Sequence, residues 1–290
     1  MGMKFDRILL AAGAIAAAIA GGPANTQTAN AQTWTGIYVG ANGGYAWRGD
    51  TTTSFTANDP TAQRMTCGGE GGATCPGSLN TDLKGGFGGL QVGYNRQVNP
   101  NWVFGVEFDL SLAAIRGSGT GADFNLFISP ANFTGEQEIK WFATFRGRAG
   151  YLATPGLLLF GTGGLAVAGV DESSILKVPV GAGFGGSDGP TSFLCHQPFG
   201  SMPDCFRGSR SRTATGWTAG GGLEYAVMPN LTIKTEYLYV GLSRSPVRVT
   251  ALVTDNTPIP SSFNANFGRP DFHLVRFGLN YNFGGCIGSC

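Results

Sequence analysis

The chain has little charge and no long apolar run. Asp, Glu, Lys and Arg make up 13% of its 290 residues and leave a net charge of +1, about half the charged share usual for soluble proteins. A nearly neutral chain has no general attraction for nucleic acid, so we expect no nucleic-acid partner. No apolar run reaches the roughly 18 residues of a membrane-spanning helix. If the chain crosses a membrane, it must do so as a closed barrel of strands, because lipid offers no partner for unpaired backbone N–H and C=O groups.

Residues 1–31 have the features of a secretory signal peptide. Lys4 and Arg7 give a positive start, and the apolar segment from Ile8 to Ala20 is too short to span a membrane. Ala29 and Ala31 supply the small residues of a cleavage site. We therefore expect Sec-type export and a mature chain that begins at residue 32.

Alternation with a period of two is the main pattern in the rest of the chain. In the segment 272–283, Val275, Phe277 and Leu279 share one face, while Arg276 and Asn280 share the other. This is the pattern of a strand with lipid outside and a polar interior. The strands predicted from it are 34–47, 85–98, 102–112, 139–152, 157–169, 213–227, 231–242 and 272–283. The faces of 157–169 cannot be assigned, because nearly every residue there is apolar or small.

The connections between these strands alternate in length. The short ones, at 99–101, 153–156 and 228–230, have the Pro, Asn and Gly composition of turns. The long ones are polar and are expected at 48–84, 113–138, 170–212 and 243–270. Long external loops and short periplasmic turns are typical of outer-membrane barrels. The prediction is an all-β fold: an eight-stranded antiparallel up-and-down transmembrane β-barrel with four long external loops.

All five tryptophans fall at predicted strand ends, as two aromatic girdles require. Trp34 and Trp102 are expected at the periplasmic interface, and Trp47, Trp141 and Trp217 at the external one.

The two end segments carry a family resemblance. WTGIYVGANGGYAW at 34–47 and VRFGLNYNF at 275–283 resemble the small outer-membrane β-barrel proteins of alphaproteobacteria, the porin-like surface antigens, whose barrel is similar to the OmpA transmembrane domain. The resemblance implies a barrel over 32–283, placed in the bacterial outer membrane by the barrel-assembly machinery, with structural or surface roles rather than enzymatic ones. The chain departs from the family at 284–290, where a cysteine-containing periplasmic tail follows Phe283.

Charged residues within the predicted strands fall mostly on the inward face. A Lys or Arg facing lipid near the midplane would cost about 2–4 kcal/mol. The predicted ion pairs join Glu107 and Asp109 to Arg146 and Arg148, Glu224 to Lys234, and Glu236 to Arg276. An eight-stranded interior is just wide enough for side chains to fill it. We expect a largely closed lumen rather than a wide pore, with a narrow polar channel as the alternative.

Six cysteines allow fifteen connectivities, but they fall in three local pairs along the chain. The expected disulfides are Cys67–Cys75, Cys195–Cys205 and Cys286–Cys290, since an exported protein meets an oxidising compartment. None of the pairs has the spacing of a zinc site, and His196 is the only histidine near one. We therefore expect no metal and no cofactor.

Five arginines gather near the outer ends of two adjacent predicted strands. They are Arg207, Arg210, Arg212, Arg244 and Arg248. Arginine suits bidentate contact with phosphate, so this group could bind lipopolysaccharide; an ordinary solvated surface is the other interpretation.

An enzymatic function is not expected. A lipid hydrolase would need a histidine near a serine at the outer rim, and only His273, with Ser243 or Ser245, could supply it. The segment 181–186 (GAGFGG) matches a dinucleotide-binding pattern, but it lacks the flanking strand and helix. The leading hypothesis is a structural outer-membrane barrel that supports the envelope and displays loops. The alternatives are a surface-binding module for haem, a host surface or lipopolysaccharide, and a narrow channel.

Overall fold

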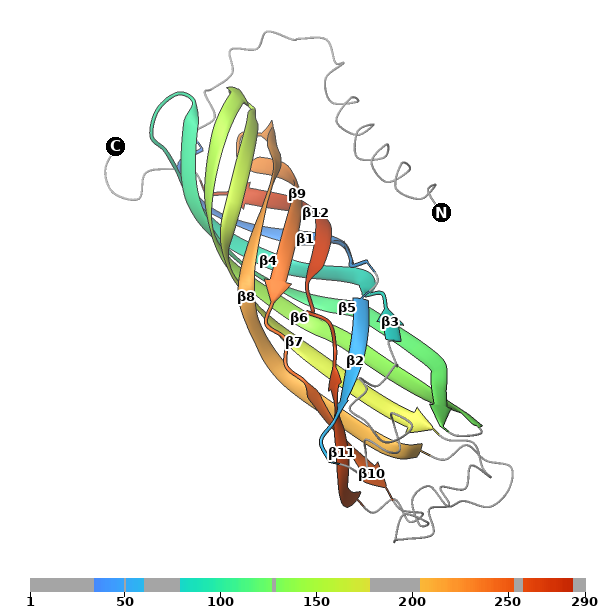
Figure 1. The fold of residues 1–290 in the computed structure, drawn as a ribbon. Coiled ribbons are helices and arrows are strands. Elements are labelled where there is room, and N and C mark those ends of the chain that lie inside the picture. Colours follow the sequence, from blue (N-terminus) through green and yellow to red (C-terminus); the bar gives the residue numbers. More distant parts are fainter. Residues whose placement is uncertain are drawn as a thin grey trace, which may run out of the picture. The chain divides into compact units, whose positions relative to one another are not determined.

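The computed structural model describes residues 34–49, 51–59, 79–126, 129–177, 204–252 and 258–283. These residues form twelve strands and confirm the all-β, antiparallel prediction (Figure 1). Within these ranges, no helix is long and apolar enough to cross a membrane. The strands are β1 (Gly36–Trp47), β2 (Thr51–Ala57), β3 (Leu79–Thr81), β4 (Lys84–Gln97), β5 (Trp102–Leu126), β6 (Ser129–Thr154), β7 (Leu157–Lys177), β8 (Asp204–Met228), β9 (Leu231–Leu242), β10 (Val247–Leu252), β11 (Pro258–Asn266) and β12 (Phe272–Asn282).

The eight long strands pair with one another in a closed cycle. β1 pairs with β4 on one side and with β12 on the other, and the series continues through β5, β6, β7 and β8. β9 pairs with both β8 and β12, which closes the cycle. Short turns join β4 to β5, β6 to β7 and β8 to β9, where the composition predicts them. Every one of these long strands therefore has a hydrogen-bonded neighbour on each side.

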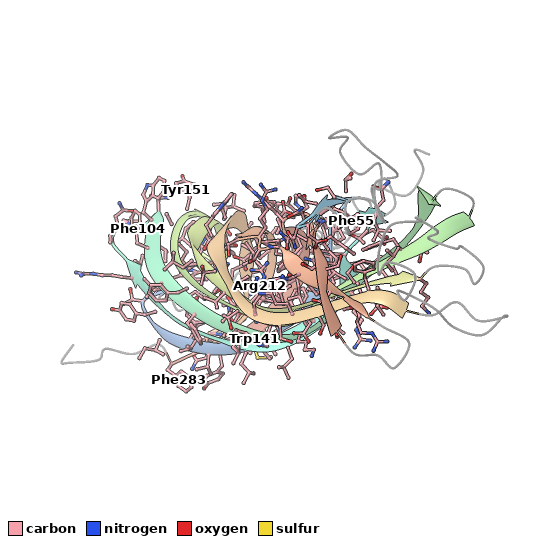
Figure 2. The ribbon with its side chains drawn as sticks, turned by 60° about the horizontal axis from the view of Figure 1, so that its bottom comes forward. Phe55, Phe104, Trp141, Tyr151, Arg212 and Phe283 are labelled. Atoms are coloured by element: carbon pink, nitrogen blue, oxygen red, sulfur yellow. The ribbon has the colours of Figure 1, made fainter. Side chains whose placement is uncertain are left out.

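Side chains alternate between the interior of this ring and its outer surface. On β12, Leu274, Arg276 and Asn280 are fully buried, whereas Phe277 and Leu279 are exposed. The faces of β7 are also settled, since Leu158, Phe160 and Ala166 are buried and Leu159 and Leu165 are exposed. Figure 2 shows Phe104, Tyr151 and Phe283 on the outer side of the ribbon. These outward apolar side chains are thus exposed and not covered by other described residues of the chain.

The predicted long connection at 113–138 is wrong. β5 continues to Leu126 and β6 begins at Ser129, so these residues are paired strand. β7 likewise extends to Lys177 and β8 begins at Asp204. The alternation of apolar and polar residues fades there because both faces of the extended sheet carry polar residues. The hydrophobic pattern therefore ends before the strands do.

The four short strands continue the strand pairing beyond the ends of β9 and β12 (Figure 1). β10 pairs with β8, β11 with β10, β2 with β11, and β3 with β2. β3 then lies against β5, where a Cβ on Gly119 would come within 2.3 Å of the Asn80 carbonyl oxygen. Only glycine permits that backbone approach. The predicted loops 48–84 and 243–270 thus contain paired strands, which polar composition concealed.

A cluster of phenylalanines lies on the buried side of these short strands. The ring of Phe263 lies 5.2 Å from Phe206, 5.6 Å from Phe133 and 5.9 Å from Phe55, centroid to centroid. These rings come from β11, β8, β6 and β2. Aromatic packing of this kind ties the added strands to the extensions of the long ones.

Candidate functional site

The interior of the ring contains a layer of eight buried charged side chains, which we call the charged layer. Four are acidic and four are basic, and each is at most 5% exposed. Its members are Glu107 and Asp109 on β5, Arg146 and Arg148 on β6, Glu224 on β8, Lys234 and Glu236 on β9, and Arg276 on β12. Sequence alternation predicts the inward position of every one, and the structure brings all eight together.

Arg146 contacts three carboxylates from two strands. Its Nη2 lies 2.9 Å from Asp109 Oδ2 and also pairs with Glu107, and its Nη1 lies 2.6 Å from Glu236 Oε1. Its Nε donates to Thr144 Oγ1 at 2.8 Å. The guanidinium fork suits such multiple contacts. Arg146 therefore links β6 to strands on both sides of the interior.

Glu107 accepts from more groups than a single ion pair would provide. Lys234 Nζ lies 2.6 Å from its Oε2, Arg276 Nη2 lies 3.0 Å from its Oε1, and Tyr38 Oη donates to Oε2 at 2.6 Å. Arg276 also pairs with Glu236 at 2.6 Å, as the sequence predicts. The carboxylate is thus compensated from β1, β6, β9 and β12, which offsets the desolvation of a buried charge.

The predicted partnership of Glu224 with Lys234 is wrong. The two residues stand opposite each other in the strand register, yet Glu224 Oε2 lies 2.7 Å from Arg148 Nη2, while Lys234 reaches Glu107. Long side chains in a narrow interior reach past their register neighbours, over one strand from Arg148 to Glu224 and to the opposite wall from Lys234 to Glu107. Arg148 also lies over the ring of Phe160, 4.2 Å from its centroid.

Uncharged polar residues add hydrogen bonds to the charged layer, a role that was not predicted for them from the sequence. Thr232 Oγ1 donates to Glu224 at 2.5 Å and Asn280 Nδ2 donates to the same carboxylate at 2.9 Å. Tyr38 lies within the interior because Gly93 faces it: a Cβ there would lie 2.3 Å from the Tyr38 hydroxyl oxygen. Each of these residues occupies an inward-facing position in the alternation along its strand, and that position could have identified it from the sequence.

Apolar side chains lie on both sides of the charged layer along the strands. The turn-side apolar layer consists of Trp34, Val103, Leu152 and Leu158. The far apolar layer comprises buried residues toward the opposite end of the ring: Ala46, Leu83, Phe87, Ile115, Ile139, Phe142, Ala166, Ala168, Val170, Ala214, Leu238, Val240, Leu242, Phe272 and Leu274. The interior is therefore lined by both apolar and polar side chains.

Trp34 belongs to this interior and not to an aromatic girdle. It is 4% exposed, and its Nε1 donates to the Pro155 carbonyl oxygen at 3.2 Å. Trp102 and Trp217 are exposed on the outer surface. The prediction of a girdle position for Trp34 is wrong because the residue precedes β1 and turns into the end of the ring.

Beyond the far apolar layer, a second set of polar side chains joins the end of β1 to β6, β7 and β8. Arg48 Nη1 donates to Gln137 Oε1 at 3.4 Å, and Gln137 Nε2 donates to Glu172 Oε1 at 2.8 Å. Arg212 Nε completes the series at 3.4 Å from Glu172 Oε2. Figure 2 labels Arg212 among the ribbons of the strands.

The five predicted lipopolysaccharide-contacting arginines do not form one surface cluster. Arg212 faces inward to Glu172. Arg210 donates to Ser245 Oγ at 2.7 Å and to the Pro246 carbonyl oxygen at 3.1 Å. Arg248 donates to Ser262 Oγ at 3.2 Å. Arg207 and Arg248 share the outward face of β8 and β10, and Arg244 lies in the connection between β9 and β10.

His273 lies among aromatic side chains on the outer surface. Its Nδ1 lies 2.6 Å from Tyr237 Oη, and its ring stacks on Trp47 with 6.1 Å between centroids. Ser245, the serine considered for an enzymatic pair, instead accepts from Arg210. This geometry provides an interfacial aromatic group.

Several predictions fall outside the described residues. The signal peptide over 1–31, the tail over 284–290, the 181–186 glycine segment and His196 all lie there. So do Cys67, Cys75, Cys195, Cys286, Cys290 and the side chain of Cys205. The processing, the disulfides and the role of the tail stay predictions.

Comparison with known proteins places these observations in a family. The family model described as "Outer membrane protein beta-barrel domain" matches residues 14–283. A 31 kDa outer-membrane immunogenic protein of Brucella melitensis is 34% identical over 251 residues, which cover 86% of this chain and 84% of the relative. A 22 kDa outer membrane protein of Rhizobium leguminosarum is 31% identical over 155 residues, covering 53% of this chain and 52% of the relative.

Two solved structures are also similar to this chain over most of its length. The outer membrane protein OprG from Pseudomonas aeruginosa matches with a TM-score of 0.41 and 10% identity, covering 86% of this chain and 97% of that one. The attachment invasion locus protein Ail of Yersinia pestis matches with a TM-score of 0.30 and 13% identity, covering 85% and 99%.

Proposed function

The chain belongs to the outer-membrane protein β-barrel family and is located in the bacterial outer membrane, and from this we propose that its eight cyclically paired strands are a transmembrane barrel with a closed lumen. In this proposal the protein supports the envelope and displays the extended strands and connections on the cell surface. It acts through structure and surface contacts rather than by catalysis.

The observation that carries the proposal is the succession of buried layers along the interior. Proceeding from the short turns, the side chains form the turn-side apolar layer, the charged layer and the far apolar layer. Arg146 and Arg276 are fully buried, as are Leu158 on one side and Phe142 and Leu274 on the other. Side chains with no accessible surface in three successive layers support a lumen without a continuous water path. The arrangement agrees with the filled interior expected of eight strands.

The orientation of the barrel in the membrane is inferred from the lengths of the connections and from the apolar side chains on its outer surface. Short turns are periplasmic and the long extensions are external in outer-membrane barrels. The outward apolar side chains include Leu90, Phe108, Phe145 and Leu279, which form the belt in contact with lipid. The Brucella relative is named as an immunogenic protein, and this supports exposure of the external part of the present chain.

Conductance in planar lipid bilayers tests the closed lumen. The refolded protein is added to one chamber, and its current is compared with that of a general porin under the same salt and voltage. We expect no stable open level. A reproducible porin-sized level would overturn the closed lumen, and a small stable level would favour the narrow polar channel instead.

A further inference from the structure

We propose that a groove on the outer surface of β5–β8, just external to the lipid-facing belt, binds the sugar headgroup of an outer-leaflet glycolipid. The inference rests on the proposed orientation of the barrel, but its test does not depend on whether the lumen conducts. No residue of the charged layer takes part in it.

The groove has a volume of about 770 Å³ and is lined by matching segments of four neighbouring strands. Residues 116–118 of β5, 136–138 of β6, 171–173 of β7 and 209–211 of β8 contribute, together with Asp82 and Lys84. Figure 1 shows these strands continuing past the ends of β9 and β12. The groove is therefore a feature of paired, registered strands rather than of a loop.

Strand register arranges the outward side chains of the groove in two rows. The row nearer the belt reads Arg116, Glu138, Asp171 and Ser211 across the four strands, with Lys84 opposite Arg116 on β4. The second row, two residues further out, reads Ser118, Glu136, Ser173 and Ser209. Two residues along a strand separate the rows by about 6–7 Å, and four strands span about 14 Å. A surface of this size accommodates a few sugar rings.

The position of the groove determines which molecules of the outer leaflet can reach it. Outward apolar side chains continue up to Leu112 on β5 and Trp217 on β8, and Trp141 lies directly below the nearer row on β6. In Figure 2 Trp141 lies at the outer side of the ribbon. Tryptophan marks the interface between acyl chains and headgroups. A lipid whose tails lie against the belt therefore presents its headgroup to the groove.

The chemistry of the lining favours hydroxyl-rich sugars over other partners. The charged residues that line the groove are the acidic Asp82, Glu136, Glu138, Asp171 and the buried Glu172, and the basic Lys84, Arg116 and Arg210; Lys140 pairs with Asp171 beside it. Mixed charge with interleaved serines offers both donors and acceptors to sugar hydroxyls. A polyanion would require an excess of cations. The lining also lacks the large apolar or aromatic anchors typical of protein interfaces.

The existing ion pairs at the groove do not prevent binding. Arg116 Nε lies 2.7 Å from Glu138 Oε1 and Lys84 Nζ lies 2.6 Å from Asp82 Oδ2, but both basic side chains are more than half exposed. Exposed ion pairs contribute little to stability. Their partners can therefore be exchanged for ligand hydroxyls or acidic substituents at small cost.

Binding of fluorescently labelled lipopolysaccharide to the full chain in detergent micelles tests the proposal. The variant Glu136→Ala/Ser173→Ala truncates the centre of the second row. We expect it to weaken binding of lipopolysaccharide with a complete core at least tenfold. The matched control, Arg207→Gln/Arg248→Gln, changes an outward site away from the groove and should leave affinity within twofold. Heat-modifiability on gels verifies that each variant is folded.

Two further probes separate recognition of the sugar from insertion of the lipid. Core oligosaccharide released from its lipid should compete with the labelled probe, and this competition should be weaker in the groove variant. Lipid A without core sugars should bind more weakly than complete lipopolysaccharide and be insensitive to the groove variant. Unchanged affinity of the folded groove variant, equal binding of lipid A and complete lipopolysaccharide, or loss of binding only in the arginine control would each overturn the proposal.

Discussion

The charged layer and the far apolar layer occupy the same interior but are stabilised in different ways. In the far apolar layer, Leu238, Val240 and Leu274 are completely buried and any side chain of suitable volume could fill the space. In the charged layer each group requires particular partners, because an unpaired buried charge is strongly unfavourable. Arg146 alone satisfies three carboxylates. One layer is therefore defined by volume and the other by pairing.

The two layers also differ in how strongly they specify the register between paired strands. A slip of one residue between paired strands would move every inward side chain to the lipid face. For leucine or valine such a slip still places an apolar group in lipid, whereas for Arg146 or Glu107 it would place a charge there. We infer that the charged layer specifies the register of the barrel, while the apolar layer mainly adds packing energy.

The largest expected effect comes from removing one member of the charged layer. Arg146→Met keeps most of the volume but leaves Glu107, Asp109 and Glu236 with less compensation, and should destabilise the barrel by about 3–5 kcal/mol. Urea unfolding in lipid vesicles, followed by tryptophan fluorescence, measures this. Arg116→Met is the matched control, because its exposed pair with Glu138 should contribute only about 0–1 kcal/mol. Equal losses in the two variants would contradict the special status of the buried layer.

A cavity in the far apolar layer should have the next largest effect. Leu238→Ala truncates a fully buried side chain and should cost about 3 kcal/mol through lost contacts and an incompletely filled cavity. Leu112→Ala is the control: this leucine is 74% exposed on the outer surface, where lipid replaces the missing atoms. The same unfolding assay applies, and the contrast fails if Leu112→Ala costs as much.

A double-mutant cycle distinguishes pairing from volume more directly. Glu236→Gln and Arg276→Met each leave the other residue of the pair with less compensation, whereas the double variant removes both members of the 2.6 Å pair. The double variant should be about 1–3 kcal/mol more stable than the sum of the single effects predicts. Val240→Ala combined with Arg276→Met provides the comparison cycle. Strict additivity for Glu236 and Arg276 would show that the charged layer acts only through its volume.

The smallest effect is expected outside the membrane, at the pair formed by Lys140 and Asp171. The hydrogen bond from Lys140 lowers the pKa of the Asp171 carboxyl below its ordinary value. Because the folded-state pKa is depressed, the pair stabilises the fold above the ordinary carboxyl pKa, and this stabilisation disappears as the pH falls through the depressed value. Lys140→Gln should raise the Asp171 pKa toward its ordinary value, measured by NMR titration of labelled aspartate. A titration unchanged from that of the original chain would contradict the contact, and Lys84→Gln serves as a control.

The sequence predicts the membrane-facing part of the fold well and the external part poorly. Where lipid lies on one side, period-two alternation identifies inward residues as different as Arg276 and Thr232. Beyond the belt, Glu136 and Gln137 are both polar although Glu136 faces out and Gln137 faces in. The alternation of apolar and polar residues therefore no longer indicates a strand there. Phe55 and Phe263 meet in space from segments that composition alone classifies as loops.

The identities of the charged-layer residues were predictable, but their partners were only partly so. Register places Glu224 opposite Lys234, and that pairing is what adjacent strands suggest. In a narrow ring, more distant strands are as accessible as the neighbouring strand: Arg148 reaches over β7 to Glu224, and Lys234 on β9 reaches Glu107 on the opposite wall. Partner choice depends on strand tilt and side-chain length, which alternation does not encode.

The pairing of the first strand with the last has a consequence for how the protein is made. β1 and β12 share ten registered residue pairs, from Tyr38 with Asn282 to Trp47 with His273. Until β12 has been synthesised, β1 has an open edge, and lipid cannot satisfy its backbone N–H and C=O groups. A partly translated chain therefore cannot enter the bilayer strand by strand as an open sheet. Insertion and closure must be concerted and follow completion of the chain, so the open edges of β1 and β12 must be kept paired or hydrated until they meet.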